Sequence, residues 1–416
     1  MINLNKCENE DPFSDPLEAL LADIAINLQL PPGLHGLAID RYEAIRDYAE
    51  REGSPLEDKI LRFYAQGSMA IDATISTRGT DDEYDLDIVA ELNIAPDTPP
   101  HEALDLLARS LAGYPVARKV ERQTRCITIR YADKMHVDVT PASRLPAGNE
   151  RDSHIFHAKE GEPASKHLHV PMNAWGFGHW YGLQTPIEPD FAKSFRQRLI
   201  EARGGTITET ADVDDVPEQT PFYVKNRATV ALQLIKRMRN IQYADFSGRM
   251  PPSVMISCFA GNVAQVGTPL SDILIAICRE MIRAIKEASD FRRKLMVVNP
   301  AFARDCFTDR WPETIGEQDR FAKLLRDFVA DLVRLKQGNV PLEEAQRILK
   351  GWFGEGVVSR SVMMLNERLG RGAKGGGRSF NPGGRIIIPG RTTAPATGLA
   401  AAAGHTFHGI LRGPAR

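Results

Sequence analysis

The sequence predicts an α+β fold in which a mixed β-sheet with helices on one side is joined to a separate helical lobe. Residues 84–92 and 135–140 alternate apolar and polar side chains with the period of two of a β-strand. Residues 222–240 and 316–336 instead repeat apolar side chains at helical spacing. No GxGxxG or GxxxxGK(S/T) motif stands at a strand–helix junction, which argues against a doubly wound dinucleotide-binding sheet and a P-loop kinase.

The composition is that of an ordinary globular protein. The 416 residues are 43% hydrophobic and 25% charged, with a formal net charge of −2, and this length suffices for two core-forming lobes. The charge balance lacks the basic footprint of a polynucleotide-binding protein but suits a small charged substrate. The five cysteines are widely spaced without a CxxC pair, no apolar run approaches a membrane span, and the N-terminus lacks a signal-peptide pattern. We therefore expect a cytoplasmic protein with no membrane segment and no polynucleotide partner.

The N-terminal stretch predicts two helices. Asp15, Pro16 and Glu18 are typical of the N-cap, first and third positions of a helix. Pro-Pro-Gly at 31–33 breaks that helix, and a second helix follows with one apolar stripe made of Ala38, Tyr42, Ile45 and Ala49.

Further elements follow from the same patterns. A helix at 101–112 and a strand at 125–131 are predicted between the two acidic strands, and residues 253–289 predict one or two apolar helices. Residues 141–190 are rich in Pro, Gly and His and are expected to be irregular. Four aromatic side chains of this stretch are expected to pack between the lobes: Trp175, Phe177, Trp180 and Tyr181.

The acidic strand at 84–92 carries the chemistry. Its alternation places Asp85 and Asp87 together on one face, and paired carboxylates repel each other, so the usual reason to keep them is a divalent cation. Asp138 takes the polar face of the second strand. If the two strands are neighbours, three carboxylates can hold two Mg²⁺ ions, with Mn²⁺ as the alternative, for in-line displacement at phosphorus. The alternative to a metal site is that these aspartates are simply solvated at the edge of the sheet.

A turn ahead of this strand offers a phosphate contact. Gly67 allows close approach of the backbone, Ser68 offers a hydroxyl, and the amides of a following helix start would suit an anion. A Gly-Ser pair alone is more often only a turn. Gly-Ser followed by Asp-Leu-Asp and then a lone strand aspartate is far more specific.

These motifs resemble those of the nucleotidyltransferase superfamily of DNA polymerase β. Three further blocks, PMNAWGFGHWYG (171–182), PFYVKNRATVALQLIKRMRN (221–240) and NPAFARDCFTDRW (299–311), resemble the bacterial cGAS/DncV-like nucleotidyltransferases of CBASS antiphage systems. The resemblance covers residues 60–335 and follows the family order. It implies a polymerase β-like palm plus a helical lobe, divided as an N-terminal helical spine (1–60), a catalytic core (61–145), an irregular connection (146–215), a helical lobe (216–369) and a flexible Gly-rich basic tail (370–416).

The resemblance also implies an activity. The protein is expected to make a cyclic di- or trinucleotide second messenger from ATP or other NTPs, with release of pyrophosphate. Asp85, Asp87 and Asp138 are the implied catalytic residues and metal ligands. Lys236 and Ser253 are implied contacts to the donor triphosphate, although a lysine near a helix end suits the helix dipole and a serine after two prolines suits an N-cap without any such role.

Other functions remain compatible with the sequence. A linear oligonucleotide synthase, an RNA or small-molecule nucleotidyltransferase, and a catalytically dead nucleotide-binding module share parts of the motif set. The resemblance further implies an accessory regulator, either HORMA-like or ubiquitin-transfer-like. The turn at 299–311, anchored by Trp311, is expected to dock the helical lobe onto the catalytic lobe. The chain ends in Arg416, which departs from the conjugated tails of some relatives, so we expect a basic linker there instead.

Overall fold

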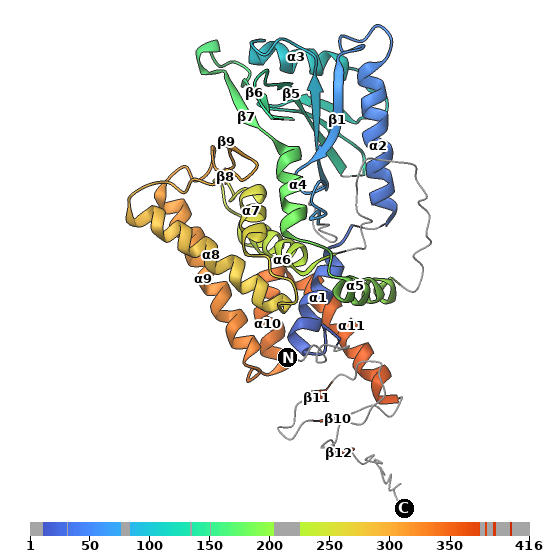
Figure 1. Ribbon diagram of the computed structural model, residues 1–416. Coiled ribbons are helices and arrows are strands. Elements are labelled where there is room, and N and C mark those ends of the chain that lie inside the picture. Colours follow the sequence, from blue (N-terminus) through green and yellow to red (C-terminus); the bar gives the residue numbers. More distant parts are fainter. Residues whose placement is uncertain are drawn as a thin grey trace, which may run out of the picture.

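The computed structural model describes residues 11–30, 32–75, 84–133, 135–149, 151–203, 225–374, 379–380, 386–387 and 400–401. A sheet lobe sits above a helical lobe (Figure 1). The helices are α1 (Pro16–Leu28), α2 (Pro32–Glu50), α3 (Pro100–Ser110), α4 (Ala174–Gln184), α5 (Pro189–Ala202), α6 (Arg227–Gln242), α7 (Ser253–Val263), α8 (Leu270–Asp290), α9 (Ile315–Lys336), α10 (Leu342–Phe353) and α11 (Glu355–Lys374). The strands are β1 (Ile60–Gln66), β2 (Tyr84–Leu92), β3 (Lys119–Arg122), β4 (Ile127–Arg130), β5 (Met135–Arg144), β6 (Ser153–His157), β7 (Leu168–Met172), β8 (Val298–Asn299) and β9 (Phe302–Cys306), with two-residue strands β10 (Ser379–Phe380), β11 (Ile386–Ile387) and β12 (Ala400–Ala401).

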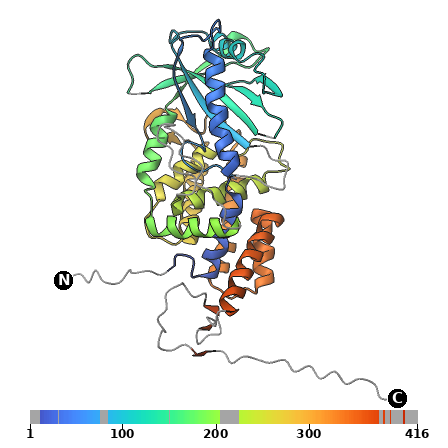
Figure 2. The same ribbon diagram turned by 90° about the vertical axis from the view of Figure 1, so that its right-hand side faces the viewer.

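The main sheet is mixed, as predicted. Its strand order is β1-β2-β5-β4-β3, and β6 and β7 extend it from the far part of β5. β2 and β5 run parallel, whereas the pairs β1–β2 and β4–β5 are antiparallel. α2 and α3 cover one face, and Figure 2 shows α2 crossing that face. The predicted arrangement of helices on one side is confirmed.

The alternation along the two acidic strands is confirmed. Leu86 and Ile88 of β2 and Val137 of β5 are buried in the core beneath α2 and α3. The intervening residues face the other way, where Val89 packs against Met172 at the end of β7. The period of two therefore places the side chains of this core on one face of the sheet and the aspartates on the other.

The helical lobe is built around α6, which is buried along most of its length. α1, α7, α8 and α10 pack against it. The helix begins at Arg227, capped by the Asn226 side chain, which accepts from Thr229 N at 2.8 Å. The sequence predicted a start at 222; residues 222–224 lie outside the described residues, and Lys225 precedes the helix.

The start of α1 is confirmed, with one difference. Asp15 Oδ1 accepts from Leu17 N at 2.8 Å and from Glu18 N at 3.3 Å, as an N-cap should. The Glu18 carboxylate does not turn back on its own helix. It accepts from Leu270 N at 2.7 Å and from Ser271 N at 3.0 Å, so it caps α8 instead.

Replacing Glu18 with alanine will destabilise the fold by about 2–4 kcal/mol, because two buried amides at the start of α8 lose their acceptor. Glu102→Ala is the matched control, since Glu102 stands in the first turn of α3 but is exposed, and it should change stability by less than about 0.5 kcal/mol. Urea unfolding of both variants tests this. Equal losses would contradict the capping role.

Two sequence expectations need correction. The stretch expected to be irregular (141–190) instead holds β6, β7 and α4, and α5 begins at its end. Pro171 lies within β7, and Gly176, Gly178 and Gly182 lie within α4, so tertiary packing overrides their low intrinsic preference for regular structure. Residues 298–306 form the β8–β9 hairpin and not only an extended turn.

The hairpin makes the expected connection between the lobes. Asn299 Nδ2 donates to Asn173 O at 2.8 Å, and Asp305 Oδ2 accepts from Asn173 N at 3.1 Å. Asn173 follows directly after β7 and caps α4. Trp311 is buried in the helical core, next to a cis peptide bond to Pro312.

Much of the expected flexible tail (370–416) lies outside the described residues, and the proposed domain boundaries stay predictions. Within the part of the chain that the structure covers, every helix is too short or too polar to be a membrane span.

Candidate active site

Three carboxylates meet on the open face of the sheet. Asp87 of β2 and Asp138 of β5 are direct partners in the parallel register, and Asp85 lies two residues before Asp87 on the same face. One oxygen of each lies within 4.8 Å of the others. Among the described residues this is the one His/Cys/Asp/Glu group with the geometry of a metal site. The sequence prediction that strand pairing brings the three together is confirmed.

The electrostatics of the cluster favour a bound cation. Burial, with the charges of Asp85 and Asp138, holds the pKa of Asp87 well above its usual range, while Lys236 and His136 oppose that rise. Burial also raises the pKa of Asp138, against the hydrogen bond from Thr128. The positive charge nearby does not offset the burial and mutual repulsion of Asp87, and hard oxygen donors are the ligands that divalent cations such as Mg²⁺ take. The residues present therefore fit a divalent metal site.

Two neighbours orient these carboxylates. Thr128 of β4 faces Asp138 in the antiparallel register, and its hydroxyl donates to Asp138 Oδ1. His136 Nε2 lies 3.1 Å from Asp85 Oδ1. Neither His136 nor Thr128 was singled out from the sequence. The period of two could have suggested His136, whereas Thr128 depends on a register that no local pattern reveals.

Gly67 lies directly against the cluster. It follows β1, whose last residue, Gln66, pairs with Asp87. Its φ is +61°, and a Cβ at this position would lie 2.3 Å from Asp87 Oδ2. Only glycine fits this conformation in this space. The close approach that the structure shows is between Gly67 and Asp87, whereas the approach of this backbone to a ligand stays a prediction.

Ser68 is half-buried beside the same site. Its hydroxyl accepts from Thr74 Oγ1 at 3.2 Å, and its carbonyl accepts from Ala73 N at 2.9 Å. The expected start of a helix after this pair is wrong for residues 67–75, where the chain makes turns without a helix. The predicted anion contact in this loop would therefore come from turn amides and the serine hydroxyl.

Lys236 is brought to the site from the middle of α6. It is buried, and its Nζ donates to Ala73 O at 2.8 Å. Burial lowers its pKa to about 7, with Arg239 acting in the same direction and the charges of Asp87 and Asp85 opposing. A lysine near these carboxylates can hold a triphosphate, and the structure adds that it also holds the loop.

Ser253 has a different place from the one expected. It is the first residue of α7, Pro252 occupies the N-cap, and no side chain caps the helix. Its hydroxyl accepts from Arg239 Nη1 at 2.9 Å, and the same guanidinium donates to Pro251 O at 2.8 Å. The N-cap expectation is therefore wrong, because the hydroxyl is taken by a buried arginine one turn beyond Lys236. A triphosphate contact by Ser253 stays a prediction.

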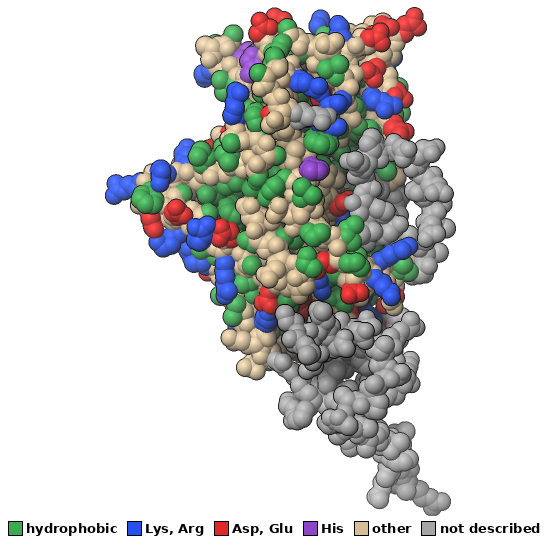
Figure 3. All heavy atoms as spheres, in the orientation of Figure 1, with side chains coloured by type: hydrophobic (Ala, Val, Ile, Leu, Met, Phe, Trp, Pro, Cys, Tyr) green, Lys and Arg blue, Asp and Glu red, His purple; other side chains and the backbone are tan. Residues whose placement is uncertain are grey.

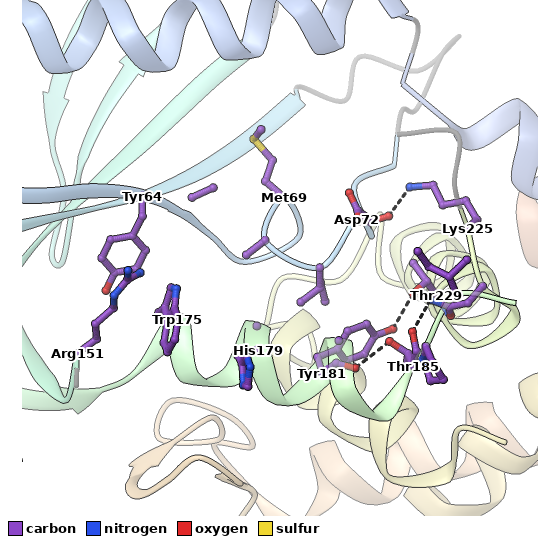
Figure 4. A pocket seen from close by; sticks show the side chains of 18 of the residues that line it. Tyr64, Met69, Asp72, Arg151, Trp175, His179, Tyr181, Thr185, Lys225 and Thr229 are labelled. Carbon is purple, nitrogen blue, oxygen red and sulfur yellow. Dashed lines mark hydrogen bonds between the residues drawn. The ribbon is translucent and has the colours of Figure 1, made fainter. Parts of the chain in front are cut away.

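A cavity of about 770 Å³ lies between β1, the loop at 69–72, α4 and the start of α6 (Figure 4), and none of the three carboxylates is among the residues that line it. The Arg151 guanidinium stands 4.2 Å from the ring centroid of Trp175, and Tyr64 lies on its other side. The expected packing between lobes holds for the buried Phe177 and Tyr181, whereas Trp175 lines the cavity.

Comparisons with known proteins place this geometry in context. Residues 61–141 match the family model described as "Cyclic GMP-AMP synthase DncV-like, nucleotidyltransferase domain". The chain is 50% identical over 407 residues to the cyclic dinucleotide synthase CdnG of Bradyrhizobium diazoefficiens, covering 97% of each chain. It is 22% identical over 362 residues to a c-di-GMP synthase of Roseivirga ehrenbergii, covering 86% of this chain and 90% of the other. The solved structure of the Bradyrhizobium protein in complex with GTP has a TM-score of 0.75 at 51% identity, covering 85% of this chain and all (100%) of that one.

Proposed function

The chain belongs to the bacterial cGAS/DncV-like nucleotidyltransferases of CBASS antiphage systems, which make cyclic oligonucleotides from NTPs, and we propose that it converts GTP, alone or with a second NTP such as ATP, into a cyclic dinucleotide. The choice of guanosine and of a two-nucleotide ring is supported by the similar enzyme of Bradyrhizobium diazoefficiens, a cyclic dinucleotide synthase whose structure holds GTP. A HORMA-like or ubiquitin-transfer-like regulator stays a prediction.

One observation carries the catalytic part of the proposal: three carboxylates converge next to the Gly67–Ser68 turn. Asp85, Asp87 and Asp138 would hold divalent cations, most simply two Mg²⁺, which when bound would neutralise triphosphate charge and lower the pKa of an acceptor ribose hydroxyl. The turn amides and the Ser68 hydroxyl would bind the donor triphosphate, and Lys236 in its protonated form would add positive charge next to the loop.

The chain's own residues prepare the reaction by orientation. Thr128 fixes one oxygen of Asp138, and His136 fixes one oxygen of Asp85, which would leave the remaining oxygens available to bind the cations. In the reaction an acceptor hydroxyl forms a bond to the α-phosphorus, its proton is released, and the bond to pyrophosphate breaks. A second transfer within the linear intermediate closes the ring.

A linear product or a polynucleotide acceptor is the competing function. On the face drawn in Figure 3, basic and acidic side chains are interspersed over the described part of the chain. A polynucleotide groove would instead gather basic residues along one path. The small-substrate reading is therefore favoured.

Mass spectrometry of the products will distinguish these functions. The protein is incubated with Mg²⁺ and GTP alone, ATP alone, or both, without nucleic acid. We expect a product resistant to phosphatase, with one pyrophosphate released for each phosphodiester bond, and no product in EDTA. A product that keeps its 5′-triphosphate, or synthesis only after RNA is added, would contradict cyclisation.

A further inference from the structure

The loop that follows Ser68 is held by side chains from the helical lobe at three successive carbonyls. Lys225 Nζ donates to Asp72 O at 2.6 Å, a bond drawn in Figure 4. Lys236 Nζ donates to Ala73 O at 2.8 Å, and Gln233 Nε2 donates to Thr74 O at 2.9 Å. Gln233 and Lys236 lie on α6 and Lys225 stands just before it, so the segment cannot shift without breaking several hydrogen bonds together.

Gln233 is itself fixed by a buried partner. It is 0% exposed in α6, and Gln29 at the end of α1 is 4% exposed. Gln29 Nε2 donates to Gln233 Oε1 at 2.8 Å, and Gln233 Nε2 donates back to Gln29 Oε1 at 3.3 Å. The Gln233 amide thus has its oxygen and one hydrogen paired with Gln29, and its remaining hydrogen points to Thr74 O. Its orientation is set before any substrate arrives.

The held segment in turn determines where Ser68 lies. Thr74 Oγ1 donates to Ser68 Oγ at 3.2 Å, and Ala73 N donates to Ser68 O at 2.9 Å. A continuous series of hydrogen bonds therefore runs from Gln29 through Gln233 and Thr74 to the hydroxyl that stands beside the acidic site.

We infer that Gln233 is a positioning residue for nucleotide binding: through Thr74 it holds the Ser68 hydroxyl where the donor triphosphate is bound. The inference rests on the proposed function, in which Ser68 contacts that triphosphate. Gln233 makes no contact with the carboxylate cluster in the hydrogen bonds of the described residues, so its effect passes through the loop. A contact present in both the ground state and the transition state affects KM more than kcat.

Steady-state kinetics of Gln233→Met test this. Methionine keeps the length and apolar bulk of the side chain but removes the amide, and we expect KM for GTP to rise about tenfold, the equivalent of one lost hydrogen bond, with a smaller change in kcat. Gln318→Met is the matched control. Gln318 is also 0% exposed, donates to Ser289 Oγ and Arg293 O, and lies on α9 away from the loop, so its loss should lower Tm without changing KM.

A double-mutant cycle with Ser68→Ala separates the possible failures. If Gln233 acts through Ser68, Gln233→Met will change KM much less in the Ser68→Ala background than in the wild type. An unchanged KM in Ser68→Ala alone would overturn the triphosphate role of Ser68. A raised KM in Ser68→Ala, with an independent and multiplicative effect of Gln233→Met, would overturn only the inference about Gln233.

A second variant guards against a folding defect. Thr74→Val leaves the main-chain hydrogen bond to Gln233 in place and removes only the hydroxyl that donates to Ser68. It should raise KM for GTP in the same way and show the same loss of effect in the Ser68→Ala background. An unaltered KM in folded Thr74→Val would show that the series of hydrogen bonds does not reach the substrate.

Discussion

Asp87→Asn will nearly abolish nucleotide transfer, by about 10³-fold or more, and will at the same time stabilise the metal-free protein. The loss of activity follows from the central place of Asp87 among the three carboxylates. The gain in stability follows because burial and two neighbouring carboxylates disfavour the ionised form of this residue, as its raised pKa indicates. Removing that charge should increase the free energy of unfolding by on the order of 1 kcal/mol in EDTA.

The same variant has a defined pH signature. An aspartate in an unfolded chain has a pKa of about 3.9. The pKa of Asp87 in the folded protein lies above that value. Between those two values the folded state binds more protons, so the stability of the metal-free wild type falls as pH rises through this interval. Asp87→Asn should lack this part of the pH dependence, and added Mg²⁺ should stabilise the wild type more than the variant.

Thermal unfolding in EDTA and in Mg²⁺, with pyrophosphate release measured in parallel, tests both effects. Asp97→Asn is the control, because Asp97 is an exposed aspartate in the loop that follows β2. It should leave both stability and activity unchanged. An Asp87→Asn protein that keeps its activity would remove the catalytic assignment, and one that is less stable in EDTA would remove the electrostatic account.

Gly67→Ala will reduce activity by about 10²-fold or more and cost about 1–2 kcal/mol of stability. The backbone φ of +61° is strained for alanine, and its Cβ would lie 2.3 Å from Asp87 Oδ2 and 3.1 Å from Asp87 Cγ. Either the loop or the carboxylate must move. Movement of the loop displaces Ser68, and movement of the carboxylate opens the cation site, so both outcomes impair the reaction.

Gly53→Ala is the matched control for backbone strain. Gly53 has a φ of +73°, and a Cβ there would meet nothing within 4 Å. It should show the conformational cost without the loss of activity. Comparing kcat and the free energy of unfolding for the two variants isolates the contact with Asp87. Equal activities of the two variants would show that the close approach at Gly67 has no catalytic role.

The sequence by itself determined those features that depend on one element at a time. The alternation that places Asp85 and Asp87 on one face and Leu86 on the other is local, since successive side chains of a strand point to opposite sides. The start of α1 at Asp15 is local for a similar reason, because the cap bonds amides two and three residues away. Motif order then indicated the family before any geometry was known.

Only the tertiary structure decided which distant groups meet. Glu18 stands where a cap for its own helix is expected, yet it serves α8, because its buried carboxylate lies against amides that are far away in sequence. Thr128 reaches Asp138 through strand register, and Gln233 reaches Thr74 through the packing of α6 against the loop. Such contacts have no period and no fixed spacing. They arise because buried polar groups must find partners, and the partner available is set by how the elements pack.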